Sequence, residues 1–253
     1  MNKSSAFTDG FRWSFSKLEA FEHCPMMFKL VYLDGHPAFG NAFSEYGTFC
    51  HGLLEEWAKG ECSAIALAEE YERRYDEAVV HTFPPFPKGM ADKYYEAGLR
   101  YFESFMGFDG YDILAAEEKF VVDIGDYPVS GVVDLVLRNQ ETGEITVIDH
   151  KSKSAATMKK DLDIYRRQLY IYAAYVKRKY GYFPTRLSFN LFREGSFIHE
   201  DFDPAQFEAT MTWVVRTIEQ ILFETDWKAL PSSYFCQFVC DVATECPVFQ
   251  EDG

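Results

Sequence analysis

Residues 131–134 read Gly-Val-Val-Asp, and residues 146–151 read Thr-Val-Ile-Asp-His-Lys. Both stretches are rich in β-branched residues, and the turn-forming segment 139–143 lies between them, which predicts a hairpin. Alternate residues of a strand share a face, so Asp149 and Lys151 point the same way, and Asp134 can approach Asp149 from the preceding strand. Two converging carboxylates suit Mg²⁺ or Mn²⁺, and a neighbouring lysine can orient water or offset charge on a phosphate. The alternative is a charged hairpin face with an ordinary ion pair.

The segments around this hairpin predict a sheet flanked by helices. Apolar residues recur at helical spacing in the first hundred residues, and the period changes to two near residue 112. The predicted helices cover about residues 16–32, 43–59, 64–80, 90–106, 160–180 and 204–225. The predicted strands cover residues 112–124, 129–138, 144–151, 186–192 and 196–202. We therefore expect a single α/β domain over 1–253, with a helical portion (1–110), a mixed-sheet core (111–202), and a helix and cysteine-rich cap (203–253) closing onto the N-terminus.

The net charge argues against broad contact with nucleic acid. The 253 residues include 40 acidic and 25 basic side chains, which gives a net charge of −15. However, residues 151–186 hold ten lysines and arginines against two aspartates, a local charge of +8. This basic segment begins at Lys151 and includes Lys153, Arg166 and Arg167, which we interpret as a path for a phosphate backbone. A narrow basic groove in an acidic protein favours single strands or duplex ends, whereas the alternative is a solvated helix face.

Several classes of protein are excluded by the same composition. No stretch approaches the roughly 18 apolar residues of a membrane span. The first residues lack the apolar core of a secretion signal, so the sequence predicts a cytoplasmic protein with no membrane partner. Six cysteines in a chain of this length are too few for a disulfide scaffold, and a reducing compartment would keep them as thiols or metal ligands.

Three of the cysteines cluster near the C-terminus. Cys236, Cys240 and Cys246 follow one another at the spacing of metal ligands, and Cys24 is the candidate for a fourth position. Soft thiolates suit an iron–sulfur cluster or zinc, and the spacing leaves both open. The alternative is a set of buried structural thiols, which is also how we interpret Cys50 and Cys62.

Further motifs lie on both sides of the hairpin in a fixed order. The segment from Ser16-Lys-Leu18 through Phe21, Cys24-Pro25 and Phe28 to Tyr32 resembles an S-x-L…F…C-P…F…Y signature. It is followed by Gly47-Thr-Phe-Cys-His51, by Glu117-Glu118-Lys-Phe120, and, after the hairpin, by Gln168-Leu-Tyr-Ile-Tyr172. Taken alone, His51 reads as a core histidine, and Gln168 and Tyr172 read as surface and core residues of one helix face. Glu117 and Glu118 point to opposite faces of a strand, so at most one of them can serve a metal.

Together these motifs resemble the PD-(D/E)XK nuclease superfamily, over nearly the whole chain. The branch that they resemble is the RecB-like group, which includes AddB-type helicase-nuclease subunits and CRISPR-associated exonucleases. The resemblance implies a restriction-endonuclease-like core and a divalent metal, Mg²⁺ or Mn²⁺. The implied metal and catalytic residues are His51, Glu117, Asp134, Asp149, the carbonyl of His150, and Lys151. Gln168 and Tyr172 are implied to bind the DNA strand or to contact the active site.

The resemblance also implies a structural [4Fe-4S] cluster on Cys24, Cys236, Cys240 and Cys246. The spacing Cys-x3-Cys departs from the Cys-x2-Cys that this branch usually shows, and zinc is the alternative. The implied activity is a metal-dependent deoxyribonuclease, most often an exonuclease acting on single strands or DNA ends. Its setting would be DNA repair, recombination or CRISPR adaptation, with a repair or CRISPR-adaptation protein as partner. The competing hypotheses are a catalytically inactive nucleic-acid-binding subunit of the same fold and a zinc-stapled variant.

Overall fold

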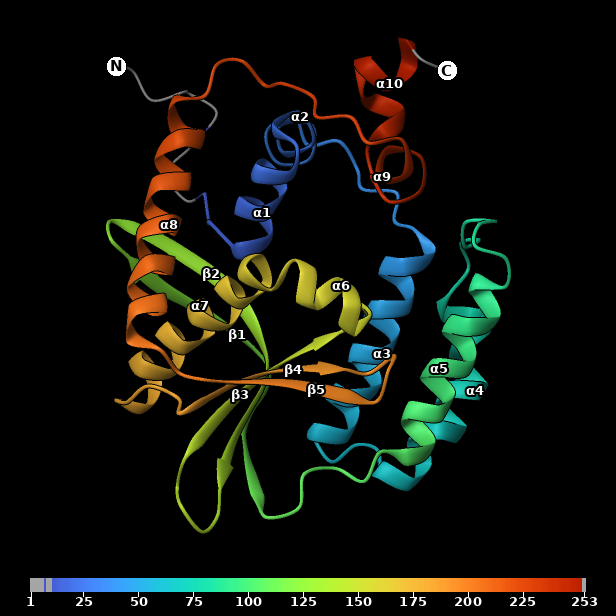
Figure 1. Ribbon diagram of the computed structural model, residues 1–253, viewed down its shortest axis with the longest axis vertical. Helices are drawn as coiled ribbons and strands as arrows, with labels where there is room; N and C mark the ends of the chain where they lie inside the picture. Colours follow the sequence, from blue (N-terminus) through green and yellow to red (C-terminus); the bar gives the residue numbers. More distant parts are fainter. Residues whose placement is uncertain (1–6, 8–10, 252–253) are drawn as a thin grey trace. The chain divides into compact units, whose positions relative to one another are not determined.

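The computed structural model describes residue 7 and residues 11–251 (Figure 1). The strands are β1 (Tyr111–Ile124), β2 (Tyr127–Asn139), β3 (Ile145–Lys151), β4 (Arg186–Leu191) and β5 (Ser196–Asp201). The longer helices are α3 (Ala42–Ala58), α4 (Leu67–Ala78), α5 (Met90–Ser104), α7 (Leu162–Tyr180) and α8 (Pro204–Phe223). The shorter ones are α1 (Phe15–His23), α2 (Pro25–Phe28), α6 (Ala155–Lys160), α9 (Ser233–Phe238) and α10 (Pro247–Glu251).

The five strands form one mixed sheet in the order β1-β2-β3-β4-β5. β2 and β3 are antiparallel, β3 and β4 are parallel, and β4 and β5 are antiparallel. A parallel pair needs a long crossover, and α6 and α7 supply it between β3 and β4. The left-handed Gly181, whose N–H donates to the carbonyl of Lys177 at 3.0 Å, ends α7. The predicted fold class, a mixed sheet flanked by helices, is therefore confirmed.

The described chain divides into two compact units. The sheet unit consists of residues 42–120 and 132–204, and so contains α3 to α7 and most of the sheet. The end unit consists of the described residues up to Asn41, residues 121–131, and residues from Ala205 onward. The expectation of a single domain over 1–253 stays a prediction.

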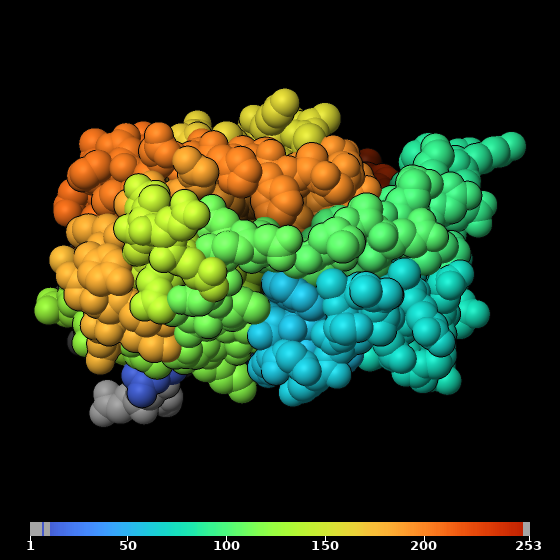
Figure 2. Space-filling model, turned by 90° about the horizontal axis from the view of Figure 1, so that it is seen from below, coloured from blue at the N-terminus to red at the C-terminus, as the bar shows by residue number. Residues whose placement is uncertain are grey.

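Aromatic side chains form the core of the helical part of the sheet unit. α4 lies against both α3 and α5 (Figure 1), and Tyr46, Tyr71 and Phe102 between them are at most 1% exposed. Gly98 on α5 permits this close packing, because a Cβ atom there would lie 2.4 Å from the hydroxyl oxygen of Tyr71. The connection between α4 and α5 projects from the surface at the right of Figure 2.

In the end unit, the helix predicted over 16–32 is interrupted, which corrects the sequence prediction. Ser14 caps α1 by accepting a hydrogen bond from the N–H of Lys17, but Cys24 has extended backbone and Pro25 begins the separate helix α2. The residue before a proline is disfavoured in helical conformation, so the chain bends at Cys24. A π-helical turn (Lys29–Leu33) follows.

Two further segments differ from the prediction. The crossover contains α6 before α7, because Ser154 caps a short helix that has too few apolar residues to show a period. The tail, where the sequence predicts no helix beyond about residue 225, contains α9, a 3₁₀ turn (Ala243–Glu245) and α10. In the described part of the chain, none of the helices combines the length and apolarity that crossing a bilayer requires.

Candidate active site

The site lies in the sheet unit, where β2 and β3 separate. Their antiparallel pairing ends at Leu135 opposite Ile148. At the next residue of β2, a side chain takes the place of the main chain as hydrogen-bond acceptor. Oδ2 of Asp134 accepts a hydrogen bond from the N–H of His150 at 2.7 Å. Asp134 is 8% exposed and Asp149 is fully buried. The structure thus brings together the two carboxylates that the sequence pattern predicts to converge.

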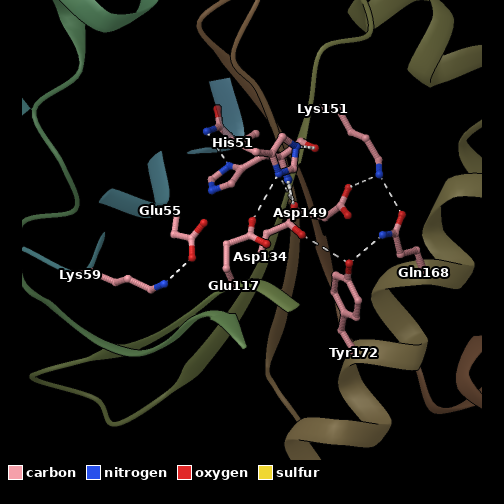
Figure 3. Close-up of polar contacts among 11 residues, drawn as sticks. His51, Glu55, Lys59, Glu117, Asp134, Asp149, Lys151, Gln168 and Tyr172 are labelled. Carbon is pink, nitrogen blue, oxygen red and sulfur yellow. Dashed lines mark hydrogen bonds and ion pairs between the residues drawn. The ribbon is translucent and has the colours of Figure 1, made fainter. Parts of the chain in front are cut away.

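Helix α3 contributes His51 to the same point (Figure 3). Its Nε2 donates to the carbonyl of His150 at 2.9 Å, so Nδ1 carries the lone pair in the neutral ring. Nδ1 lies 3.4 Å from Glu117 Oε1 and 3.6 Å from Asp134 Oδ2. One ligand atom from each of His51, Glu117 and Asp134 lies within 4.8 Å of the others. This cluster has the size of a single metal site.

Glu117 reaches the cluster through an unusual backbone conformation. With φ of 46°, it is the one non-glycine residue with positive φ among the described residues, although it lies within β1. The left-handed region costs an L-residue roughly 1–2 kcal/mol. The next residue, Glu118, instead accepts from Lys179 Nζ at 2.7 Å. The structure therefore places Glu117, and not Glu118, at the site.

We predict that strain at Glu117 is measurable as stability. The free energy of unfolding, measured with urea, should be about 1 kcal/mol higher for Glu117→Gly than for Glu117→Ala, because glycine adopts positive φ without a Cβ clash. Lys119, exposed on the same strand with negative φ, is the matched control, and there Gly should be less stable than Ala. If glycine and alanine have the same order of stability at positions 117 and 119, the backbone at Glu117 is not strained.

A chain of hydrogen bonds connects the lysine to both aspartates. Lys151 Nζ lies 2.8 Å from Asp149 Oδ2 and donates to Gln168 Oε1 at 2.8 Å. Gln168 Nε2 donates to the hydroxyl of Tyr172 at 2.7 Å, and this hydroxyl donates to Asp134 Oδ1 at 3.4 Å. Gln168 and Tyr172 lie one turn apart on α7, which explains the four-residue spacing. Their contacts here are with the active site, and strand binding by them stays a prediction.

Burial and charge perturb the titration of these groups. Burial raises the pKa of Asp149 to about 6, since Asp134 adds to the shift and Lys151 only partly offsets it. Burial likewise raises the pKa of Asp134, against the opposing charges of His51 and Lys151. Burial disfavours the charged form of His51, but its hydrogen bond to Glu117 and the neighbouring carboxylates outweigh this effect and raise its pKa. Lys151 and His51 therefore compensate the buried carboxylates only in part, and a further cation would favour their ionised forms.

The donor set fits a divalent cation. Asp149 Oδ1 is buried and accepts no hydrogen bond from any described residue, which is costly unless another positive group takes it. Carboxylate and carbonyl oxygens with one imidazole are ligands suited to Mg²⁺ or Mn²⁺. His51, Glu117 and Asp134 supply three such donors within one cluster, and the carbonyl of His150 and the carboxylate of Asp149 are neighbours of His51 and Asp134.

The predicted DNA-binding bases are partly committed to internal partners. Arg166 lies 2.7 Å from Glu200 and 2.9 Å from Asp163. The exposed Lys153 donates to the hydroxyl of Tyr165 at 2.7 Å, and Arg167 is half-buried on α7. The local charge of +8 thus overstates the positive charge that this segment offers to a ligand.

The end unit gathers the four cysteines of the predicted cluster. Cys24, Cys236, Cys240 and Cys246 all line one cavity of about 460 Å³. Main-chain N–H groups of Leu230 and Ser232 donate to the sulfurs of Cys24 and Cys236, each at 3.4 Å. Burial raises the pKa of Cys240, and although a main-chain hydrogen bond from Val242 opposes this shift, the charges of the other three thiols add to it. Cys50 and Cys62 belong to the sheet unit.

Sequence reasoning missed two residues that contact this region. Asn190 on β4 lies 3.0 Å from His150 Nδ1 and donates to the hydroxyl of Tyr101 on α5 at 2.6 Å. The sequence signal for Asn190 is weak, a single amide within the apolar strand Leu-Ser-Phe-Asn-Leu. Tyr101 looks like any core aromatic of a helix.

Among the comparisons with known proteins, the match to a family model supports the motif-based interpretation at the level of the superfamily. No curated protein matches the chain. A solved structure titled "Crystal structure of SSO0001" is similar, at 15% identity and a TM-score of 0.40, over 96% of this chain and 89% of that one. The family model of the PD-(D/E)XK nuclease superfamily matches residues 12–247, which include every residue of the site described above. On this match, the chain belongs to the PD-(D/E)XK nuclease superfamily.

Proposed function

We propose that the protein is a metal-dependent deoxyribonuclease, and that it acts as an exonuclease on single-stranded DNA or DNA ends. Membership of the superfamily implies metal-dependent hydrolysis of phosphodiester bonds in a nucleic acid. The observation that carries the proposal is the convergence of His51, Glu117 and Asp134 beside a buried carboxylate with an unsatisfied oxygen, next to Lys151.

The donors of the metal site come from helix α3 and strands β1, β2 and β3. We assign His51, Glu117, Asp134, Asp149 and the carbonyl of His150 as its ligands. A divalent cation there supplies Lewis-acid stabilisation of charge that develops on the phosphate. The protein fixes these donors beforehand, since Asp134 is held by the N–H of His150 and the hydroxyl of Tyr172.

Lys151 completes the arrangement as a donor aimed at the reacting phosphate or water. Its ammonium is anchored by Asp149 and Gln168, which use its charge and one of its hydrogens. From this position the ammonium can orient an attacking water or bind a phosphate oxygen. The side chain is only about 18% exposed, which restricts this donor to a ligand that enters the site.

The choice of single strands or ends rests on the charge distribution. A net charge of −15 repels long duplexes, and Arg166 within the basic segment is neutralised by Asp163 and Glu200. The exposed Lys153 remains close in sequence to the catalytic lysine. A short path of this kind suits a strand that passes through the site.

The affinity for metal should become weaker as the pH is lowered, because a proton and the cation compete for the same carboxylate. We predict that the Mn²⁺ affinity of the wild type decreases about tenfold for each pH unit below 6, where Asp149 becomes protonated. The raised pKa of His51 adds proton release and extends the dependence above pH 6.5. Calorimetric titration with Mn²⁺ from pH 5 to 8 measures it, and an affinity independent of pH would contradict the assignment.

For the cysteines of the end unit, we propose a [4Fe-4S] cluster in preference to zinc. Thiolates of one tetrahedral zinc ion lie about 3.8 Å apart, given a Zn–S bond of about 2.3 Å. Among the described residues, however, no three of the four sulfurs lie within 4.8 Å of one another. A cavity of about 460 Å³ between them suits a larger group, and the two N–H···S hydrogen bonds are typical neighbours of cluster thiolates.

A nuclease assay of the anaerobically purified chain tests the proposed function. The protein is incubated with Mg²⁺ or Mn²⁺ and one of three substrates. These are end-labelled single-stranded DNA, end-labelled blunt duplex DNA, and unlabelled covalently closed circular DNA. We expect the linear single strand to be shortened from one end and the circles to persist. Labels at the 5′ and 3′ ends report the polarity. If none of these DNA forms is degraded with either metal, the proposal is wrong.

A further inference from the structure

A buried polar chain lies on the opposite side of β3 from Lys151. Asn190 Nδ2 donates to the hydroxyl of Tyr101 at 2.6 Å and lies 3.0 Å from Nδ1 of His150. Asn190 is fully buried, and Tyr101 and His150 are each 5% exposed. These three side chains therefore interact almost entirely with protein, and with one another.

Asn190 is an exception within an apolar strand. Asn190 lies in a strand whose neighbours Phe189 and Leu191 are fully buried apolar residues. Its Oδ1 has no hydrogen-bond partner among the described residues, and an unsatisfied buried oxygen costs about 1–3 kcal/mol. A leucine of similar volume would avoid this cost, but it would leave the hydroxyl of Tyr101 and Nδ1 of His150 without their amide partner. The amide at this position therefore serves its two neighbours, at a cost to its own oxygen.

The register of the sheet connects Asn190 to the site. β3 and β4 pair in parallel with His150 opposite Asn190, so their side chains share one face. Asp149 and Lys151 point to the other face. The main chain of His150 lies between the two, because its N–H donates to Asp134 and its carbonyl accepts from His51. Fixing the His150 imidazole thus fixes the main-chain groups that hold two metal-site residues.

Helix α5 anchors the far end of the chain. Tyr101 lies about one turn after Gly98, where the absence of a Cβ lets α5 approach Tyr71 and Tyr46. The ring of Tyr101 packs against Phe102, Phe105 and Phe192, which hold its hydroxyl toward Asn190. The chain from Tyr101 to His150 therefore ends in a rigid aromatic core.

We propose that Asn190 is a positioning residue of the metal site. It bridges Tyr101 and the His150 imidazole, and thereby sets the direction of the His150 N–H and carbonyl toward Asp134, His51 and the cation. This role rests on the proposed metal site. Residues that orient metal ligands in this way typically change metal affinity by about 10–100-fold when they are replaced.

The test compares Asn190→Leu with Ser188→Ala. Both positions are fully buried polar residues of β4, but Ser188 bonds to Nδ1 of His199 at 2.8 Å, away from the site. We expect Asn190→Leu to bind Mn²⁺ about 10–100-fold more weakly in calorimetry, and Ser188→Ala to bind it as the wild type does. Asn190→Leu should also require more Mn²⁺ for half-maximal activity, while its KM for DNA is unchanged.

Tyr101→Phe guards against failure of Asn190→Leu to fold. It keeps the aromatic packing and removes only the hydroxyl, so we expect a smaller loss of Mn²⁺ affinity in the same direction. If folded Asn190→Leu, or Tyr101→Phe in its place, binds Mn²⁺ with wild-type affinity, the positioning role is wrong. A wild type that degrades no DNA contradicts the proposed nuclease, whereas the Mn²⁺ affinities still decide the role of Asn190.

Discussion

Asp149→Asn is expected to lower kcat/KM for DNA by about three orders of magnitude, which is the loss seen when a preorganised charge at a reacting centre is removed. The substitution keeps the size of the side chain and removes the buried negative charge that the metal and Lys151 share. Lys151→Ala should cause a loss of similar order, because the donor to phosphate or water is then absent. End-labelled single-stranded DNA with Mn²⁺ is the substrate for both.

The same substitution should have the opposite effect on the stability of the metal-free protein. The pKa of Asp149 rises from 3.8 to about 6 on folding. Above pH 6 the carboxylate is ionised in both states, and its charge then destabilises the folded protein relative to the unfolded chain. Asp149→Asn should therefore stabilise the metal-free protein at pH 7 by on the order of 2 kcal/mol, as measured by urea unfolding in EDTA. Gain of stability with loss of activity distinguishes a functional carboxylate from a structural one.

Glu118→Gln is the matched control for the acidic residues. Glu118 adjoins Glu117 on β1, but it pairs with Lys179 and lies outside the metal cluster. We expect its activity to stay within about twofold of the wild type, as for a surface ion pair. Wild-type activity in Asp149→Asn, or a loss in Glu118→Gln equal to that in Asp149→Asn, would refute the assignment of the site.

Cys24→Ser is expected to abolish the iron–sulfur cluster. An anaerobic preparation of the wild type should be brown and contain about four iron and four sulfide per chain, since a [4Fe-4S] cluster needs four thiolates. The variant should lose most of both, together with thermal stability, because binding of a metal group by four residues contributes directly to folding. Iron, sulfide and zinc analysis with a thermal melt measures these effects.

Cys62→Ser is the control for the loss of a thiol as such. Cys62 lies in the sheet unit, and its sulfur donates to the carbonyl of Ser63, so we expect full iron and sulfide content in this variant. One zinc per chain without sulfide in the wild type would overturn the cluster assignment. The cysteine set itself would then be retained as a zinc site.

Periodicity predicted most elements of the fold, because the apolar pattern is strong where one face is buried. The strands of the β2–β3 hairpin and the helix carrying His51 are examples, with bounds within a few residues. The break at Cys24 and the short helices α6, α9 and α10 were not predicted. Elements of four to six residues contain too few apolar positions to establish a period.

The site was predictable to the extent that it depends on local spacing. Asp149 and Lys151 share a face through the two-residue period of a strand, and Gln168 and Tyr172 share one through a helical turn. The left-handed backbone of Glu117 and the contact of Tyr101 with Asn190 depend instead on how distant segments pack. No spacing rule connects residues 89 positions apart.

The separation of β2 from β3 at Asp134 ties the chemistry to the pairing of the whole hairpin. A residue inserted within the paired segment would rotate Asp134 to the opposite face of the sheet. The proposed metal-binding carboxylate therefore depends on the register of the hairpin as much as on its own side chain.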